Sequence, residues 1–355
     1  MSRRQWLAGT GAAVAAGAAV GVGTIVGALA RDVLRAELAV DDGPDDLLVA
    51  PSTEPERRMV TTVDGTRLHV EIHGPRGEDT GDVVVAVHGW TCNTAFWNAQ
   101  INHLAGTHTV VVYDQRGHGR SELGRARPTI DMLGRDLDAV LAAVVPPGRR
   151  AMLVGHSMGG MTIMSWAAQF PEKVPTIATS AVLASTAAHN VVNSTLLLPT
   201  GLPRYTRPFV PAINRAFTSA PVPLPHTAYS GRFAHYVALG SAARASHVEF
   251  VDTMIAACPP RARAGWGSAM GRLDVRAGLA ALTVPTTVIV GDEDRLTPPA
   301  HAEQIAEILR GHGHLREHVV LPGVGHMSPI EAAGRVDEIL ERQAAQTLSV
   351  PVGQR

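Results

Sequence analysis

Short runs of apolar residues alternate along the chain with longer stretches in which apolar residues recur at helical spacing. Val83–Val87, Val110–Tyr113 and Met152–Val154 contain almost no polar side chain, which is typical of strands buried on both faces of a sheet. Residues 130–145 have the spacing of a helix. The later elements that continue the alternation are strands over 177–183, 286–290 and 318–321 and a helix over 299–309. We therefore predict an α/β fold with a mostly parallel, doubly wound sheet.

Two segments depart from this alternation. Residues 59–73 alternate polar and apolar positions around Asp64-Gly65, which predicts a β-hairpin with a tight turn. Residues 186–283 interrupt the strand–helix order. Within them, 199–225 carries seven prolines and is predicted to contain no regular helix, whereas 233–254 has helical apolar spacing. We interpret 186–283 as a mainly helical lid inserted over the carboxyl edge of the sheet, with a surface elaboration as the alternative.

These boundaries divide the chain into six parts. Residues 58–185 and 284–345 are predicted to form one core, interrupted by the lid at 186–283. The segment 36–57 is acidic and proline-rich, as linkers often are. The predicted terminal parts are an export signal or membrane anchor at 1–35 and a tail at 346–355.

The N-terminal segment has the pattern of a targeting sequence. Arg3-Arg4 precede an aromatic residue, a leucine and an uncharged run that ends in Ala28-Leu29-Ala30. This arrangement resembles a twin-arginine export signal, with cleavage after Ala30. Since residues 7–30 are long enough to cross a bilayer, an uncleaved anchor and membrane association are alternatives. A cytoplasmic protein with a frayed tail is the third.

The net charge and the cysteine content limit the kinds of partner and cofactor that the sequence predicts. The formal net charge is −1 and the pI is about 7.0, which argues against a general nucleic-acid-binding protein. Cys92 and Cys258 do not form a Cys-x-x-Cys pair, so no zinc or thioredoxin-like site is indicated. We expect two buried free thiols, no metal and no organic cofactor. The oligomeric state does not follow from the sequence.

Ser157 stands between two glycines directly after an apolar run, in Leu-Val-Gly-His-Ser-Met-Gly-Gly. A sharp turn from a strand into a helix would strain the serine backbone and raise its Oγ above the sheet. The glycines would let strand and helix approach closely. This pattern indicates a nucleophile, which needs a general base.

His326 is the predicted base among sixteen histidines, since it follows the last strand in a loop of small residues. A carboxylate must orient such a base, and Asp294 is our choice from Gly-Asp-Glu-Asp after the strand over 286–290. Asp292 follows the turn glycine directly and is expected to serve the turn. The backbone N–H groups of Trp90 and Met158 are the predicted oxyanion donors.

Five motifs together resemble the α/β-hydrolase superfamily, over roughly residues 59–345. They are His88-Gly89-Trp90, Asp114 to Ser121, Gly155 to Gly160, Gly291 to Pro298 and Gly325-His326, in the expected order. The resemblance implies a serine esterase or lipase-like enzyme with the triad Ser157, Asp294 and His326. In the loop 114–121, Asp114 and Arg116 are interpreted as structural.

The expected substrate is a small-molecule carboxylic ester with an apolar acyl group, cleaved through an acyl-enzyme. Trp97, Phe209 and Tyr236 are predicted to line its pocket, with core packing as the alternative. Perhydrolases, thioesterases and carbon–carbon bond hydrolases use the same triad and remain open. Epoxide hydrolases and haloalkane dehalogenases use aspartate at the nucleophile position, so Ser157 argues against them. A non-catalytic binding protein with this fold is the alternative from another class.

Overall fold

The computed structural model describes residues 23–34, 39, 43–75, 83–195, 202–224 and 226–347. The predicted export or anchor segment therefore lies mostly outside the described residues, as does the end of the predicted tail. The description of side chains further omits Asn193, Ala228, Gln346 and Thr347.

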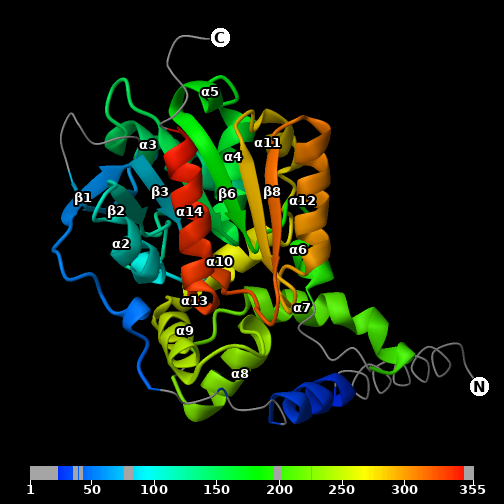
Figure 1. Cartoon of the computed structure of the whole chain (residues 1–355). Helices are drawn as coiled ribbons and strands as arrows, with labels where there is room; N and C mark the ends of the chain where they lie inside the picture. The colour runs from blue at the N-terminus through cyan, green and yellow to red at the C-terminus, as the bar shows by residue number, and fades with distance from the viewer. Residues whose placement is uncertain are drawn as a thin grey trace, which may run out of the picture.

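An eight-stranded sheet forms the centre of the molecule, in the order β1-β2-β4-β3-β5-β6-β7-β8 (Figure 1). The strands β3 to β8 are mutually parallel, while β2 is antiparallel to both β1 and β4. The strand bounds are β1 Glu56–Thr61, β2 Arg67–His73, β3 Val83–Val87, β4 Val110–Tyr113, β5 Ala151–His156, β6 Ala178–Ala184, β7 Thr286–Gly291 and β8 Leu315–Leu321. The predicted hairpin and the predicted parallel strands are confirmed.

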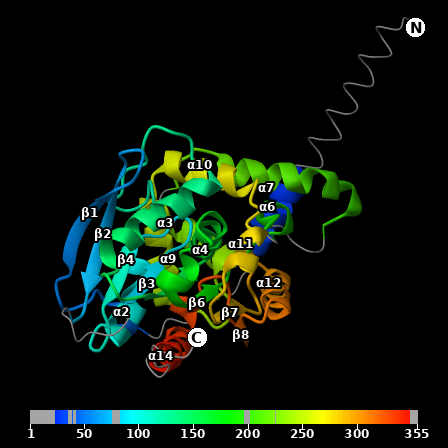
Figure 2. The same ribbon diagram turned by 90° about the horizontal axis from the view of Figure 1, so that it is seen from above.

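Helices cover both faces of the sheet, as the buried strand pattern requires. Figure 2 shows α3 (Ile130–Val144), α4 (Met158–Gln169) and α12 (Pro299–Gly311) on one side, and α2 (Asn98–Leu104) and α14 (Ala333–Thr347) on the other. Two hydrophobic clusters result, one for each face of the sheet. The short elements of this core are η1 Asp46–Leu48, η2 Thr94–Trp97, α5 Val174–Ile177 and α13 Ser328–Glu331.

The segment between β6 and β7 is mainly helical. Its elements are α6 Val191–Ser194, η3 Arg204–Phe209, α7 Val210–Ser219, α8 Ala228–Ala238, α9 Ala245–Ala257, α10 Pro260–Met270 and α11 Arg276–Ala281. Figure 1 shows α8, α9 and α10 beneath the sheet, on the side where α13 follows β8. The last helix, α11, packs on α4 so closely that a Cβ at Gly278 would lie 1.8 Å from the carbonyl oxygen of Met164. We call residues 186–283 the insertion.

Two local expectations for the insertion were inaccurate. The proline-rich stretch does contain a regular helix, α7, because Pro211 lies in its first turn, where the missing N–H costs no hydrogen bond. The helical spacing over 233–254 belongs to two helices, α8 and α9, which a connection over residues 239–244 separates.

Residues 23–34 are helical and lie against the insertion. Leu29 and Val33 pack on Tyr236 and Val237 of α8, and Arg232 donates to the carbonyl oxygen of Leu34 at 3.2 Å. Within the described ranges, no helix is long and apolar enough to cross a bilayer.

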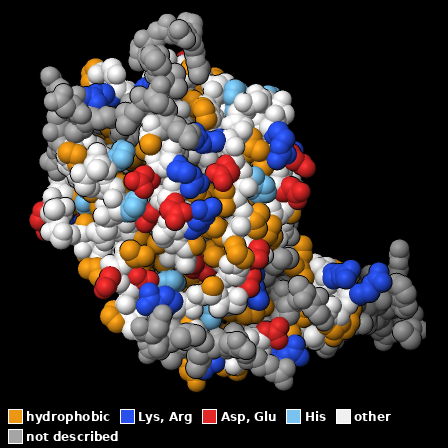
Figure 3. All heavy atoms as spheres, in the orientation of Figure 1, with side chains coloured by type: hydrophobic (Ala, Val, Ile, Leu, Met, Phe, Trp, Pro, Cys, Tyr) orange, Lys and Arg blue, Asp and Glu red, His pale blue; other side chains and the backbone are white. Residues whose placement is uncertain are grey.

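Charged side chains of both signs lie on one face of the molecule. Figure 3 shows acidic and basic groups interspersed over the face that carries α14 and β8, with hydrophobic side chains between them. Cys92 and Cys258 are both buried and free, as predicted. Burial raises the pKa of the Cys258 thiol to about 12 and that of Cys92 still further.

Candidate active site

Ser157 occupies the turn between β5 and α4, at the carboxyl edge of the sheet. Its backbone has φ 52° and ψ −116°, which residues with a side chain adopt only where the surrounding structure holds them. The Ser157 N–H donates to the carbonyl of Ala184 at 2.9 Å. Its carbonyl accepts the Thr186 hydroxyl at 2.7 Å. The predicted strained corner is therefore present and firmly anchored to the end of β6.

The glycines near Ser157 allow three backbones to meet. A Cβ on Gly155 would lie 2.6 Å from the backbone of Gly159. One on Gly159 would lie 2.0 Å from the carbonyl oxygen of Val87. Any side chain at either position would push α4 away from β3 and β5, and the serine would move with it.

His326 and Asp294 form a buried hydrogen-bonded pair, from the loops after β8 and β7. His326 Nδ1 lies 2.9 Å from Asp294 Oδ2 and 3.0 Å from Oδ1. The Asp294 carboxylate also accepts the backbone N–H groups of Leu296 at 2.9 Å and Thr297 at 2.8 Å. Because a carboxylate only accepts, Nδ1 carries the imidazole proton and Nε2 is left to accept one.

The two other acids of this loop have different partners. Asp292 accepts the backbone N–H of Gly323 at 2.7 Å, as expected for a turn residue. Glu293 accepts the N–H and the hydroxyl of Ser241, both at 2.7 Å. The acid that the loop presents to the histidine is therefore Asp294.

The loop after β3 lies directly against the nucleophile turn. A Cβ on Gly89 would be 3.2 Å from the Cβ of Ser157. Trp90 lines the same cavity as Ser157, and its indole N–H donates to the carbonyl oxygen of Arg263 at 3.0 Å. Met158 begins α4, where the free N–H groups and the helix dipole favour negative charge. The residues predicted to carry the oxyanion donors, Trp90 and Met158, thus lie in the loop beside the nucleophile turn and directly after the nucleophile.

Two neutral histidines hold this loop. His88 Nδ1–H donates to the carbonyl of Gly89 at 2.7 Å, and its Nε2 accepts the N–H of Gln115 at 3.0 Å. His118 Nε2 accepts the N–H of Thr91 at 3.2 Å, where Thr91 has φ 66°. Burial lowers the pKa of His88 to about 4 and that of His118 to about 3. Both rings therefore keep one accepting nitrogen at neutral pH.

Asp114 and Arg116 have the structural role predicted for them. Arg116 is 2% exposed and pairs with Asp136 at 2.7 Å and Asp64 at 2.8 Å. Its hydrogen bonds hold the pKa of the Asp64 carboxyl well below its usual range. Asp114 accepts the backbone N–H of Thr94 at 2.8 Å. This network fixes the turn next to the site and leaves the reacting groups untouched.

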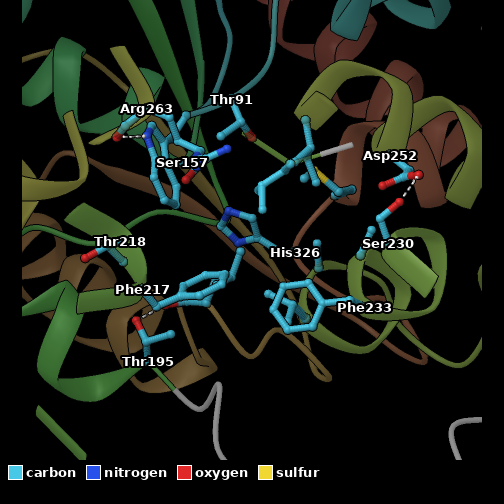
Figure 4. Close-up of a pocket in the computed structure, with 18 of the residues that line it drawn as sticks. Thr91, Ser157, Thr195, Phe217, Thr218, Ser230, Phe233, Asp252, Arg263 and His326 are labelled. Atoms are coloured by element: carbon cyan, nitrogen blue, oxygen red, sulfur yellow. Dashed lines mark hydrogen bonds between the residues drawn. The ribbon is translucent and has the colours of Figure 1, made fainter. Parts of the chain in front are cut away.

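A cavity of about 470 Å³ lies over Ser157 and His326, within the usual size of small-molecule sites. Figure 4 shows Ser157 and the His326 ring facing this space, with the rings of Phe217 and Phe233 beyond them. Most lining side chains are apolar, and the insertion supplies the majority of them. The described residues contain no group of three His, Cys, Asp or Glu side chains that could hold a metal ion.

A family model described as the alpha/beta hydrolase fold matches residues 82–333. The chain belongs to the α/β-hydrolase family. The match spans β3 to the start of α14 and therefore includes the insertion and all three residues of the predicted triad.

Known relatives of this α/β hydrolase are moderately similar. A Variovorax paradoxus protein named as a carbamate hydrolase (RutD) is 31% identical over 255 residues, which are 68% of this chain and 84% of the relative. A bifunctional esterase/perhydrolase of Acinetobacter calcoaceticus is 27% identical over 285 residues, 79% of this chain and 97% of the relative. A thermophilic esterase from Thermogutta terrifontis, solved with malate bound, superposes with a TM-score of 0.66 at 24% identity, covering 82% and 99% of the two chains. At this sequence identity, the similarity to the thermophilic esterase shows the fold alone.

The three predicted pocket residues are not among those that line the cavity, which corrects that prediction. Trp97 is fully buried, and its ring packs edge-on against that of Phe96, with 5.0 Å between the ring centroids. Tyr236 faces away from the cavity, with the Arg295 guanidinium 4.2 Å from its ring centroid. Phe209 is partly buried at the end of η3. The aromatic residues that do line the cavity are Trp90, Phe217, Tyr229 and Phe233.

Sequence reasoning did not single out Glu331, the last residue of α13. Its carboxylate accepts the N–H groups of Gly325 and Met327, at 3.0 Å each, on either side of His326. It also accepts the N–H of Gly240 in the α8–α9 connection at 2.7 Å. Burial raises the pKa of Glu331 to about 7. The sequence feature that could have identified Glu331 is an acidic residue in the mostly apolar segment Met-Ser-Pro-Ile-Glu-Ala-Ala.

Proposed function

We propose that this α/β-hydrolase family enzyme cleaves a carboxylic ester of a small or lipid-like substrate through an acyl-enzyme on Ser157. The observation that carries the proposal is the arrangement of the three groups. A strained serine at a helix N-terminus shares a cavity with His326, whose Nδ1 is held by Asp294 at 2.9 Å. This arrangement leaves Nε2 as the base for the serine hydroxyl.

In the proposed mechanism, Ser157 Oγ attacks the ester carbonyl and His326 Nε2 takes its proton. The backbone N–H groups of Trp90 and Met158 bind the tetrahedral oxyanion. His326 then gives its proton to the leaving alcohol, which departs and leaves the acyl group on the serine. Water attacks the acyl-enzyme with the same histidine as base, and the acid is released. Asp294 stabilises the imidazolium in both halves of the reaction.

We propose that the insertion is the lid of this site and selects an apolar acyl group. Phe217 and Phe233 come from α7 and α8 and face the cavity together with Val191 and Val192 of α6. Burial of apolar surface favours a hydrocarbon chain there by about 0.8 kcal/mol per methylene. We expect esters of medium-length acids to be cleaved faster than acetate.

Perhydrolysis is the second candidate reaction, because the similar Acinetobacter enzyme is named as both esterase and perhydrolase. In that reaction hydrogen peroxide replaces water as the attacking group, and a peracid leaves. Thioesters and activated carbon–carbon bonds would use the same triad. A binding protein without catalysis is disfavoured because serine, histidine and acid are all present and the last two are in contact.

Export by a twin-arginine-like signal, or membrane attachment through residues 7–30, remains our proposal for the N-terminal segment. It rests on the sequence pattern alone. Fractionation of an expressing cell, with mass determination of the mature N-terminus, tests it. Uncleaved protein in the soluble cytoplasmic fraction would contradict both forms.

Hydrolysis of p-nitrophenyl esters from acetate to palmitate tests the proposed function, with Ser157→Ala as the matched variant. Activity that the substitution abolishes, with labelling of Ser157 by a fluorophosphonate in the wild type, supports a serine esterase. Addition of hydrogen peroxide and assay of peracid separates perhydrolysis. A folded wild-type protein that neither hydrolyses any ester nor reacts with the fluorophosphonate would refute the proposal.

A further inference from the structure

The backbone around His326 is held by hydrogen bonds to residues outside its own loop. The His326 N–H donates to the carbonyl of Ala238 at 2.9 Å, and its carbonyl accepts the Nε2–H of His156 at 2.9 Å. Glu331 binds the N–H groups on both sides, those of Gly325 and Met327. The N–H groups of Gly325, His326 and Met327 and the carbonyl of His326 are therefore all paired.

We propose that Glu331 is a positioning residue, which fixes His326 for catalysis and joins it to the base of the insertion. The proposal rests on the proposed function, since it assumes that His326 is the base. The carboxylate has a distinct use for each oxygen: Oε2 accepts Gly240 and Gly325, and Oε1 accepts Met327. One side chain thereby binds the backbone on both sides of the histidine.

The link to the insertion is equally close. A Cβ on Gly240 would lie 2.3 Å from the carbonyl oxygen of Gly323 and 2.6 Å from the N of Gly325. Ala242 N–H donates to the carbonyl of Gly323 at 3.0 Å. The α8–α9 connection and the histidine loop therefore form one packed unit, and the Glu331 side chain accepts hydrogen bonds from both.

The test variant is Glu331→Gln in the full-length protein. An amide has one accepting oxygen, so its NH₂ must face either Met327 or the pair formed by Gly240 and Gly325, donor against donor. We expect the histidine to shift and kcat to fall by about 10- to 100-fold, because sub-ångström to 1 Å displacements of catalytic groups have effects of that size. KM should stay within about threefold, since Glu331 does not line the cavity.

Gly240→Ala perturbs the same unit from the insertion side and should also lower kcat. Glu293→Gln is the matched control: Glu293 binds Ser241 in the same connection but contacts neither neighbour of His326, so its kcat should be unchanged. The rate of fluorophosphonate labelling should follow kcat in all three variants.

The outcomes separate the possibilities. If wild-type and Glu331→Gln proteins share kcat and labelling rate while only the melting temperature falls, Glu331 is merely structural and the inference is wrong. If Glu331→Gln does not fold, Gly240→Ala decides: unchanged kcat there overturns the link. A wild type that neither hydrolyses nor labels refutes the proposed function instead.

Discussion

Replacing Asp294 by Asn should reverse the proton arrangement of His326 and leave the fold intact. The N–H groups of Leu296 and Thr297 both point at Oδ1, so the amide oxygen of Asn must take that position. The NH₂ group then replaces Oδ2, which lies 2.9 Å from His326 Nδ1. Because NH₂ only donates, the nearer partner of Nδ1 becomes a donor, which favours the tautomer with the ring proton on Nε2 even though the oxygen at Oδ1 stays 3.0 Å from Nδ1. The nitrogen that should take the proton from Ser157 is thereby blocked.

The expected loss is about 10⁴-fold in kcat, the size seen when a triad histidine is held in the wrong tautomer. That ratio corresponds to about 5 kcal/mol of activation free energy. The free energy of unfolding should change by less than about 1 kcal/mol, since the amide keeps the two backbone hydrogen bonds.

The assay is the initial rate of ester hydrolysis at saturating substrate and pH 8, beside urea unfolding of each protein. Asp292→Asn is the control, because the same substitution two residues away keeps an oxygen for the N–H of Gly323 and should leave kcat unchanged. An Asp294→Asn enzyme within tenfold of wild type would show that Asp294 does not set the tautomer.

Three further predictions concern the surroundings of the site. Gly89→Ala should lower kcat by about 100-fold with little change in KM, since its Cβ would lie 2.7 Å from His156 Nδ1 and 3.2 Å from the Cβ of Ser157 and would displace the loop that carries the proposed donor Trp90; intact kcat would disprove that displacement. Arg116→Met should cost about 3–5 kcal/mol in urea unfolding, because it leaves Asp136 buried and unpaired; a loss under about 1 kcal/mol contradicts this. Burial raises the pKa of Glu331 from 4.5 to about 7, so between these pH values the folded state binds more protons than the unfolded one and wild-type stability falls as pH rises. Between these pH values the free energy of unfolding of the wild type should fall by about 3 kcal/mol more than that of Glu331→Gln. Parallel stability–pH profiles of the two proteins would refute this prediction.

The core of the fold could be predicted because its signals are local. The central parallel strands β3 and β4 are unbroken apolar runs, so their burial on both faces is written in four or five adjacent residues. The strain at Ser157 could be predicted for the same reason, since the glycines that relieve crowding stand within two residues of it. The pairing of His326 with Asp294 needed only the rule that carboxyl ends of parallel strands meet at one edge.

The insertion could not be predicted in the same detail. Apolar residues of its helices face either the cavity or the core, and spacing along one helix does not say which. Tyr236 and Phe233 lie three positions apart on α8, yet Phe233 lines the cavity and Tyr236 does not. The role of Glu331 could not be predicted from the sequence, because its partners are backbone N–H groups. Every residue except proline has such a group, and no sequence pattern marks the ones that Glu331 binds.

The two buried cysteines lie at one boundary of the molecule, that between the core and the insertion. Cys92 lies in the loop after β3 and Cys258 between α9 and α10 of the insertion. Neither thiol can ionise or meet a reagent while its surroundings stay closed. The alkylation rate of each therefore measures how often this boundary opens. Because a charge on Cys258 raises the pKa of Cys92, the two thiols lie close together. A ligand that closes the insertion onto the core should therefore slow the modification of both.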